Sequence, residues 1–126
     1  MPESQRASAS AWRTEEHLWV SGQGGYHTYR IPALAVTTKG TVLAFCEGRR
    51  DSRSDSGKID LLLRRSFDAG RTWGPVQVIW GEDAMTCGNP APVVDRDTGT
   101  VWLPFCKNLA DGPERMIIEG KAPRTA

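Results

Sequence analysis

Two arginines and one aspartate stand where side chains could act on an anionic ligand. Arg30 lies between a glycine-rich loop and an apolar, strand-like run, and an arginine at such a junction can form a bidentate pair with a carboxylate. Arg49 belongs to the run 47–50 (EGRR), and Asp55 follows in a polar loop. A carboxylic acid on such a loop can close over a substrate and protonate a leaving group, provided that burial raises its pKa.

Each of these residues also has a plain structural interpretation. Arg30 could be a surface arginine in an ion pair, and Asp55 could be a solvated loop carboxylate. Strand alternation puts Glu47 and Arg49 on one face and Arg50 on the other, so one of the two arginines should point into a site. We favour Arg49 for that position.

Short strands are expected to carry these groups. The runs 17–20, 29–36, 41–47, 59–65 and 74–80 have strand-like composition and are separated by Gly-, Pro- and Asp-rich turns. Ile31 is expected to be extended because it precedes Pro32. Four such strands form an antiparallel meander, and a four-stranded meander is one blade of a β-propeller. The sequence therefore predicts an all-β fold.

The stretch 66–73 is the most specific pattern in the chain, because it reads S-x-D-x-G-x-T-W. Asp68 can accept hydrogen bonds from nearby backbone N–H groups, and Gly70 can adopt a positive φ without steric cost. The ring of Trp73 can cover the turn. The five spaced residues of the pattern are Ser66, Asp68, Gly70, Thr72 and Trp73.

The pattern of the first unit then restarts. Segment 88–94 is similar to 30–36, the turn 95–100 is similar to 37–41, and 101–106 is similar to 42–46, which gives an internal repeat of about 55–60 positions. No second S-x-D-x-G-x-T-W follows. We expect residues 1–16 to be poorly ordered, blade one to span about 17–80, and a partial blade two to span about 81–126.

Composition narrows the classes of function. The 126-residue chain has a net charge of +1, so it carries no basic field for nucleic acid. Three cysteines without CxxC spacing predict neither a disulfide framework nor a metal site, and Cys46 and Cys106 are expected to be small core residues. The chain has no apolar run long enough to span a membrane and no signal-like segment, so as written it is expected to be cytoplasmic.

These motifs in this order resemble the start of an exo-α-sialidase (neuraminidase) catalytic domain. They are Tyr-Arg-Ile-Pro at 29–32, Glu-Gly-Arg at 47–49 with its Ser-Asp loop, the Asp box at 66–73, and Gly-Asn-Pro-x-Pro-Val-Val-Asp at 88–95. The resemblance covers about residues 19–108. It implies a six-bladed β-propeller, of which this chain holds the first blade and part of the second, with the Asp box on the turn between the outer strands of a blade.

The resemblance also implies a reaction: release of terminal sialic acid from glycoconjugates with retention. In this family three arginines grip the substrate carboxylate, and Arg30 matches the first of them. Arg49 matches a further pocket arginine, and Asp55 matches the general acid and base. The nucleophile is a tyrosine activated by a glutamate, since a phenol attacks an anionic sugar without the repulsion that a carboxylate meets. The chemistry requires no metal or other cofactor, and the partner is a sialylated glycan.

The chain departs from the family in length. The other two triad arginines, the nucleophilic tyrosine and its glutamate lie in later blades, and Tyr26 and Tyr29 do not match the nucleophile. We therefore expect an N-terminal fragment that is inactive in isolation and self-associates through exposed blade edges. The alternatives are a non-catalytic Asp-box module that binds carbohydrate, and a gene fragment without function.

Overall fold

The computed structural model describes residues 13–121, and these residues form an all-β fold with one short helix. The predicted poorly ordered segment lies largely outside the described residues, as does the end of the tail. The elements are β1 Thr28–Val36, β2 Val42–Arg49, β3 Ile59–Ser66, β4 Gln77–Trp80, β5 Met85–Gly88, β6 Val93–Val94, β7 Val101–Trp102, β8 Cys106–Leu109 and α1 Glu114–Ile118.

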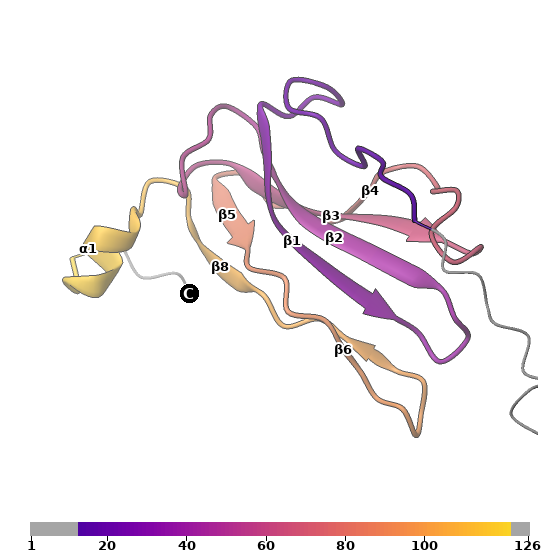
Figure 1. The fold of residues 1–126 in the computed structure, drawn as a ribbon. Coiled ribbons are helices and arrows are strands. Elements are labelled where there is room, and N and C mark those ends of the chain that lie inside the picture. Colours follow the sequence, from indigo (N-terminus) through magenta and orange to yellow (C-terminus); the bar gives the residue numbers. More distant parts are fainter. Residues whose placement is uncertain (1–12, 122–126) are drawn as a thin grey trace, which may run out of the picture.

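The first four strands make the predicted antiparallel meander, in which β1 pairs with β2, β2 with β3, and β3 with β4 (Figure 1). β2 is the central strand between β1 and β3, and its side chains are buried along almost its whole length because other segments pack against both of its faces. β1 instead alternates between half-buried and exposed side chains, as a strand with one open face does. The glutamate and arginine that end β2 are therefore held on a rigid central strand.

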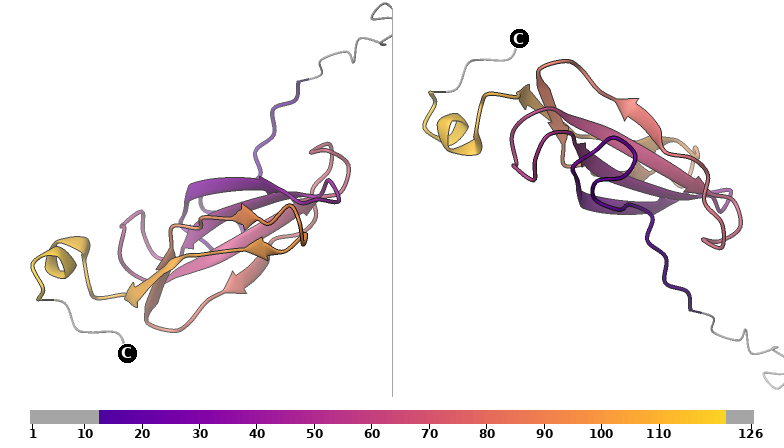
Figure 2. Two further views of the ribbon diagram at one scale, coloured as in Figure 1. Left: turned by 90° about the horizontal axis from the view of Figure 1, so that it is seen from below. Right: turned by 90° about the horizontal axis from the view of Figure 1, so that it is seen from above.

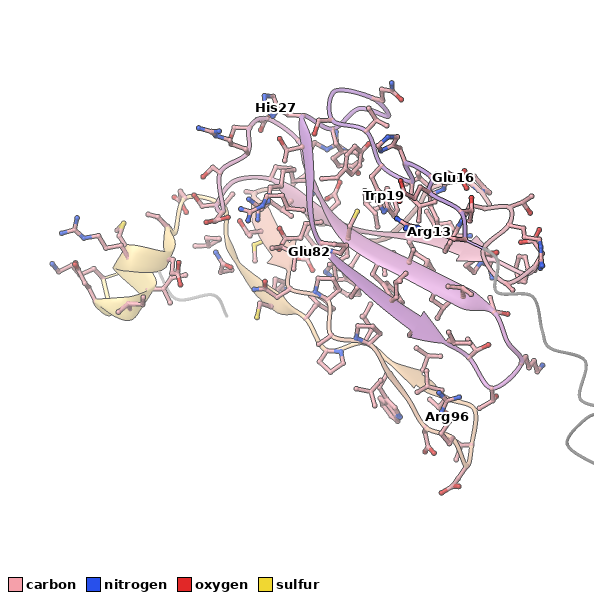
Figure 3. All side chains as sticks on the ribbon, in the orientation of Figure 1. Arg13, Glu16, Trp19, His27, Glu82 and Arg96 are labelled. Atoms are coloured by element: carbon pink, nitrogen blue, oxygen red, sulfur yellow. The ribbon has the colours of Figure 1, made fainter. Side chains whose placement is uncertain are left out.

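Two chain segments cover the two faces of this sheet, and Figure 2 shows one on each side. On one face, the N-terminal segment packs Trp19, which Figure 3 labels, against the buried cluster of Tyr26, Cys46 and Leu62. On the other face, residues from β5 and its neighbours pack on Leu61. The two faces of β3 therefore carry separate apolar clusters, one around Leu62 and one around Leu61.

The later strands extend the same sheet. β5 pairs in parallel with β3 at a single position, Ile59 with Thr86, and pairs antiparallel with β8 over its full length. β6 and β7 form a separate two-stranded hairpin. The turns of this hairpin and of the β1–β2 hairpin touch, since a Cβ added to Gly99 would lie 3.0 Å from Thr38 Oγ1. A second unit that starts near residue 81 remains a prediction.

Two predicted strands, and one run expected to be a strand from its similarity to 42–46, differ from what is observed. The run 17–20 is not a strand. Trp19 is half-buried against the sheet, but the Leu18 carbonyl accepts a hydrogen bond from the Arg64 side chain and not from the backbone of a neighbouring strand. β4 begins at Gln77 rather than near residue 74, because Pro75 has no N–H to donate. The run 101–106 is split into β7 and β8 around Pro104 for the same reason.

Ile31 overturns the prediction that it is extended. Its φ is +55°, in the left-handed region, which a β-branched side chain strongly disfavours. The pairing of β1 with β2 shifts register between Arg30 and Ala33, so Ile31 lies within a β-bulge. The bulge outweighs the local preference of a residue before proline, and it changes the direction of the strand beside Arg30.

The burial of the three cysteines was only partly predicted. Cys46 is buried as expected, and burial raises the pKa of its thiol to about 12. Cys106 is exposed, contrary to prediction, because it begins the edge strand β8. Cys87 is fully buried beneath Leu61. The short helix α1 was not predicted; it begins after Pro113, which suits the start of a helix.

Candidate functional site

Arg49 is the centre of a charged cluster at the end of β2. Its guanidinium donates to Glu47 Oε2 from Nε at 2.9 Å and from Nη2 at 2.7 Å. Its Nη1 donates to Asp55 Oδ1 at 2.8 Å and to the carbonyl of Arg53 at 2.7 Å. Burial alone would lower the pKa of Arg49, but the hydrogen bonds to Glu47 and Asp55 outweigh it and raise the pKa above its ordinary value. The side chain is 4% exposed, so it is a fixed cation.

Asp55 lies between the two arginines that the sequence singled out. Arg30 Nη1 donates to Asp55 Oδ1 at 3.2 Å, so one carboxylate oxygen accepts from both guanidinium groups. The Asp55 side chain is 70% exposed and that of Arg30 is 51% exposed, whereas Arg49 is enclosed. The structure therefore brings Arg30, Arg49 and Asp55 together at one place, with the carboxylate on the open side.

Glu47 completes the cluster, and sequence reasoning did not select it as a site residue. Its Oε2 accepts from Arg49, and its Oε1 accepts from the backbone N–H of Asn89 at 3.0 Å. Asn89 adopts a left-handed backbone conformation at this contact, with φ +55°. A Cβ on Gly88 would lie 2.2 Å from Glu47 Oε1, so glycine is required for β5 to pass this close. Strand alternation placed Glu47 on the same face as Arg49, and this was a signal that could have identified Glu47 as a site residue.

The cluster lines an open cleft of about 570 Å³ between the ends of β1 and β2 and the layer formed by β5, β8 and α1. One wall carries Arg30, Ile31 and Arg49, and the other carries Asn108, Lys107 and Glu114. A neighbouring hollow of about 680 Å³ shares Arg30 and Asp55. The volume of the cleft lies within the range of small-molecule sites, and several polar side chains converge on it.

Arg50 points to the other face of the sheet, as alternation predicted. Its Nη2 lies 3.5 Å from Asp60 Oδ2, and its guanidinium stands over the ring of Tyr26, 5.5 Å from the centroid. The Tyr26 hydroxyl donates to Asp60 Oδ2 at 2.7 Å. Burial, with that hydrogen bond, raises the pKa of Tyr26 to about 12. Of the two adjacent arginines, Arg49 is thus the one that faces Asp55.

The Asp box forms the expected turn. Asp68 Oδ1 accepts from the Thr72 backbone N–H and from Ser66 Oγ, both at 2.8 Å, and Asp68 Oδ2 accepts from Thr72 Oγ1 at 2.5 Å. Gly70 has φ +87° and donates to Ser66 Oγ at 2.8 Å. Trp73 lies beside the turn, with Cζ2 3.9 Å from the position of a Gly70 Cβ. Hydrogen bonds from Thr72 lower the pKa of Asp68 to about 2.

The turn lies at the far end of β3 from Arg49, since Ser66 pairs with Val42 while Ile59 pairs with Arg49. The Asp box and the arginine cluster therefore lie at opposite ends of the β2–β3 pair. Residues 13–121 contain no group of three or more His, Cys, Asp or Glu side chains that could hold a metal ion. Over the same residues, no helix is long and apolar enough to cross a membrane.

Known proteins that are similar to this chain are sialidases. A sialidase from Micromonospora viridifaciens is 42% identical over 116 residues, which is 89% of this chain and 17% of the relative. An exo-α-sialidase from Aspergillus fumigatus is 42% identical over 85 residues (63% and 21%). Human sialidase-4 is 42% identical over 97 residues (72% and 20%). No protein-family model matches the chain.

Among solved structures, the Hadza microbial sialidase Hz136 superimposes with a TM-score of 0.66 at 30% identity, over 73% of this chain and 20% of that one. The meander, its Asp-box turn and this likeness define the class of protein: an all-β unit of the sialidase β-propeller type. By sequence and fold the chain belongs to the exo-α-sialidase (neuraminidase) family. It spans about a fifth of the length of the curated relatives that it matches.

Proposed function

We propose that this chain supplies part of a sialic-acid site and the general acid of an exo-α-sialidase that releases terminal sialic acid with retention. The observation that carries the proposal is the meeting of two guanidinium groups on Asp55 at the mouth of an open cleft. In this assignment Arg30 binds the substrate carboxylate, Arg49 orients polar groups of the sugar, and Asp55 transfers the proton.

The arrangement of charges supports an order of events in this proposal. Arg49 is neutralised locally by Glu47, so the exposed guanidinium of Arg30 is the cation that an incoming carboxylate can reach. That carboxylate competes with Asp55 for Arg30, because both are acceptors for the same fork of N–H donors. Asp55 is exposed and sits on a loop, so it can leave the guanidinium groups, take up a proton and present it to the leaving oxygen.

We infer that neither tyrosine of the chain serves as the nucleophile. Tyr26 donates its hydroxyl to Asp60 on the opposite face, and Tyr29 donates its hydroxyl to the Gln23 carbonyl at 2.5 Å. These are the two tyrosines of the chain. Neither hydroxyl contacts Asp55 or Arg30, so we propose that the isolated 126-residue chain binds the sugar acid without turning over a sialoside.

An NMR titration with N-acetylneuraminate tests the proposal. Shifts are expected at the Nε–H resonances of Arg30 and Arg49, and Arg30→Gln should weaken binding by roughly tenfold or more, since a charge-assisted bidentate pair contributes about 1.5–3 kcal/mol. Arg96→Gln removes the same charge from the exposed β6–β7 turn and is the matched control. Equal affinity of the wild-type and Arg30→Gln proteins would refute the assignment.

A fluorogenic sialoside assay tests the catalytic part of the proposal. The isolated chain should show no hydrolysis above background, and Asp55→Ala should leave that background unchanged. Hydrolysis that disappears in Asp55→Ala would mean that a nucleophile is present within these 126 residues. Binding that survives both Arg30→Gln and Asp55→Ala would instead favour a carbohydrate-binding module whose ligand lies elsewhere.

A further inference from the structure

The loop that carries Asp55 is fastened at both of its ends to one buried carboxylate. The loop runs from Arg50 to Lys58, and its stems are joined by a backbone hydrogen bond from Arg50 N to Lys58 O at 3.1 Å. Lys58 Nζ lies 2.8 Å from Asp60 Oδ1, and Arg50 Nη2 lies 3.5 Å from Asp60 Oδ2. Asp60 is on β3, across the sheet from the Glu47–Arg49 pair.

Asp60 is itself held firmly. Its side chain is 2% exposed, and the Tyr26 hydroxyl donates to Oδ2 at 2.7 Å. A Cβ on Gly81 would lie 2.5 Å from Oδ1, so the chain closes tightly on that oxygen. Oδ1 accepts no well-directed hydrogen bond from the described residues, and the ammonium group of Lys58 supplies its charge compensation.

A buried carboxylate of this kind requires its cations. Removing the opposite charge from a buried carboxylate leaves a group whose desolvation is uncompensated, which is strongly unfavourable. The side chains of Lys58 and Arg50 must therefore stay over Asp60, and their positions fix both stems of the loop. Thr86 Oγ1 donates to the Gly57 carbonyl at 2.6 Å and secures the Lys58 side further.

The fixed stems leave the tip of the loop with one favourable direction. Asp55 at the tip reaches Arg49 and Arg30 on the opposite face of the sheet from Asp60. The loop thus wraps around the end of the sheet, with its stems held on one side and its functional carboxylate presented on the other. Figure 3 labels His27 at this end, and its backbone N–H donates to the Arg50 carbonyl at 3.2 Å.

We infer that Asp60 is a positioning residue, which holds the Arg50–Lys58 loop so that Asp55 stands at the two arginines. The inference rests on the proposed function for the meaning of that position, but the fastening itself is measurable without substrate. Asp60 touches neither Arg30 nor Arg49, so its effect passes through the loop.

The test compares two variants with matched controls in the full chain. Asp60→Asn keeps an acceptor for Tyr26 and removes the charge, and Arg50→Gln releases one stem from the half-exposed side. Asp51→Asn removes the same charge at an exposed loop side chain that has no hydrogen bond or ion pair to the described residues, and Arg96→Gln makes the matching arginine change at the exposed β6–β7 turn. If Asp60→Asn does not fold, Arg50→Gln tests the inference by itself.

Amide hydrogen exchange is the first measurement. Both variants should speed exchange of the backbone amide at position 50, corrected for its intrinsic rate, by roughly tenfold relative to the buried Leu61 amide on β3, as expected for the loss of a charged tether. The Arg49 Nε–H resonance should persist, because Glu47 still holds it. A general loss of stability would instead speed both amides together, and that outcome overturns the inference, as does exchange that equals the controls.

Affinity for N-acetylneuraminate is the second measurement, and it separates the two proposals. If the wild-type protein binds and the variants bind several-fold more weakly, the fastening matters for the ligand. If the wild-type protein does not bind but loop exchange still responds to Asp60→Asn, the proposed function fails and the fastening stands. Unchanged binding together with unchanged loop exchange removes Asp60 from any role at the site.

Discussion

Ile31 holds a backbone conformation that its own side chain opposes, directly beside Arg30. A left-handed φ costs an ordinary residue about 1–2 kcal/mol relative to glycine, so the normal order of alanine and glycine should reverse here. We expect Ile31→Gly to be more stable than Ile31→Ala by about 1 kcal/mol in urea unfolding, because both variants lose the same side chain. Ala35→Gly in the same strand is the control and should lose about 0.5–1 kcal/mol. An Ala variant at position 31 that matches or exceeds the Gly variant would contradict the conformation.

Asp68 makes the Asp-box turn sensitive to acid. Its pKa in the folded protein is lowered to about 2 from an ordinary value of 3.8, so its contribution to stability is complete above about pH 4 and is lost as the pH falls through about 2. The melting temperature of the wild-type protein should therefore fall across this range. Asp68→Asn should begin lower and lose less over the same interval, while Asp97→Asn, at an exposed turn, should follow the wild-type curve. Parallel curves for all three proteins would exclude this role.

At this scale, the sequence identified some of the charged residues and missed others for a clear physical reason. Alternation along 45–50 assigned Arg49 and Arg50 to opposite faces, and the structure has them so. Asp60 resembled any acidic residue at the start of a strand. Its partners Tyr26 and Lys58 approach from a separate segment and from the loop, so only the folded chain reveals that it is buried. The bulge at Ile31 was equally hidden, because local preference predicted the opposite geometry.

Among the elements, the close approach of β5 to β2 allows the most sensitive test of how the strands pack. Gly88→Ala would place a Cβ 2.2 Å from Glu47 Oε1, and Glu47 cannot withdraw because Arg49 and the Asn89 amide hold it. We expect a loss of about 1–3 kcal/mol in unfolding free energy. Gly74→Ala meets only an ordinary contact, 3.5 Å from the Arg65 carbonyl, and should be neutral or slightly stabilising. Similar melting temperatures for both variants would show that β5 lies further from β2.

The strands of the meander were predictable because they combine apolar alternation with strong turn signals. β1, β2 and β3 begin and end within about two residues of their predicted bounds. The strands after residue 80 were less predictable, since short runs interrupted by Pro90, Pro92 and Pro104 do not show where a ladder resumes. The parallel contact of β5 with β3 depends on the crossing of the chain and has no local signal.

For the whole molecule, exposed apolar side chains should drive association. The N-terminal segment covers one end of its face, and Leu34 (68% exposed) and Val78 (55%) lie open on the same face. We expect the mass in sedimentation equilibrium to rise with concentration, and the pair Leu34→Lys and Val78→Lys to weaken association by at least about tenfold, since burying one such side chain contributes about 1.5–3 kcal/mol. Ser21→Lys adds a charge at an exposed turn as the control. A wild-type protein that stays monomeric at every concentration would argue against this surface.

The unequal burial of the three sulfur atoms has a practical consequence. Two thiols are sealed inside the two layers, while Cys106 opens onto the cleft that holds the arginine cluster. A maleimide dye would thus attach at a single place in the native protein and at three after denaturation. The number of labelled thiols would therefore report whether the protein is folded. The fluorescence of a dye on Cys106, beside the arginine cluster, would report the binding of a ligand in the cleft.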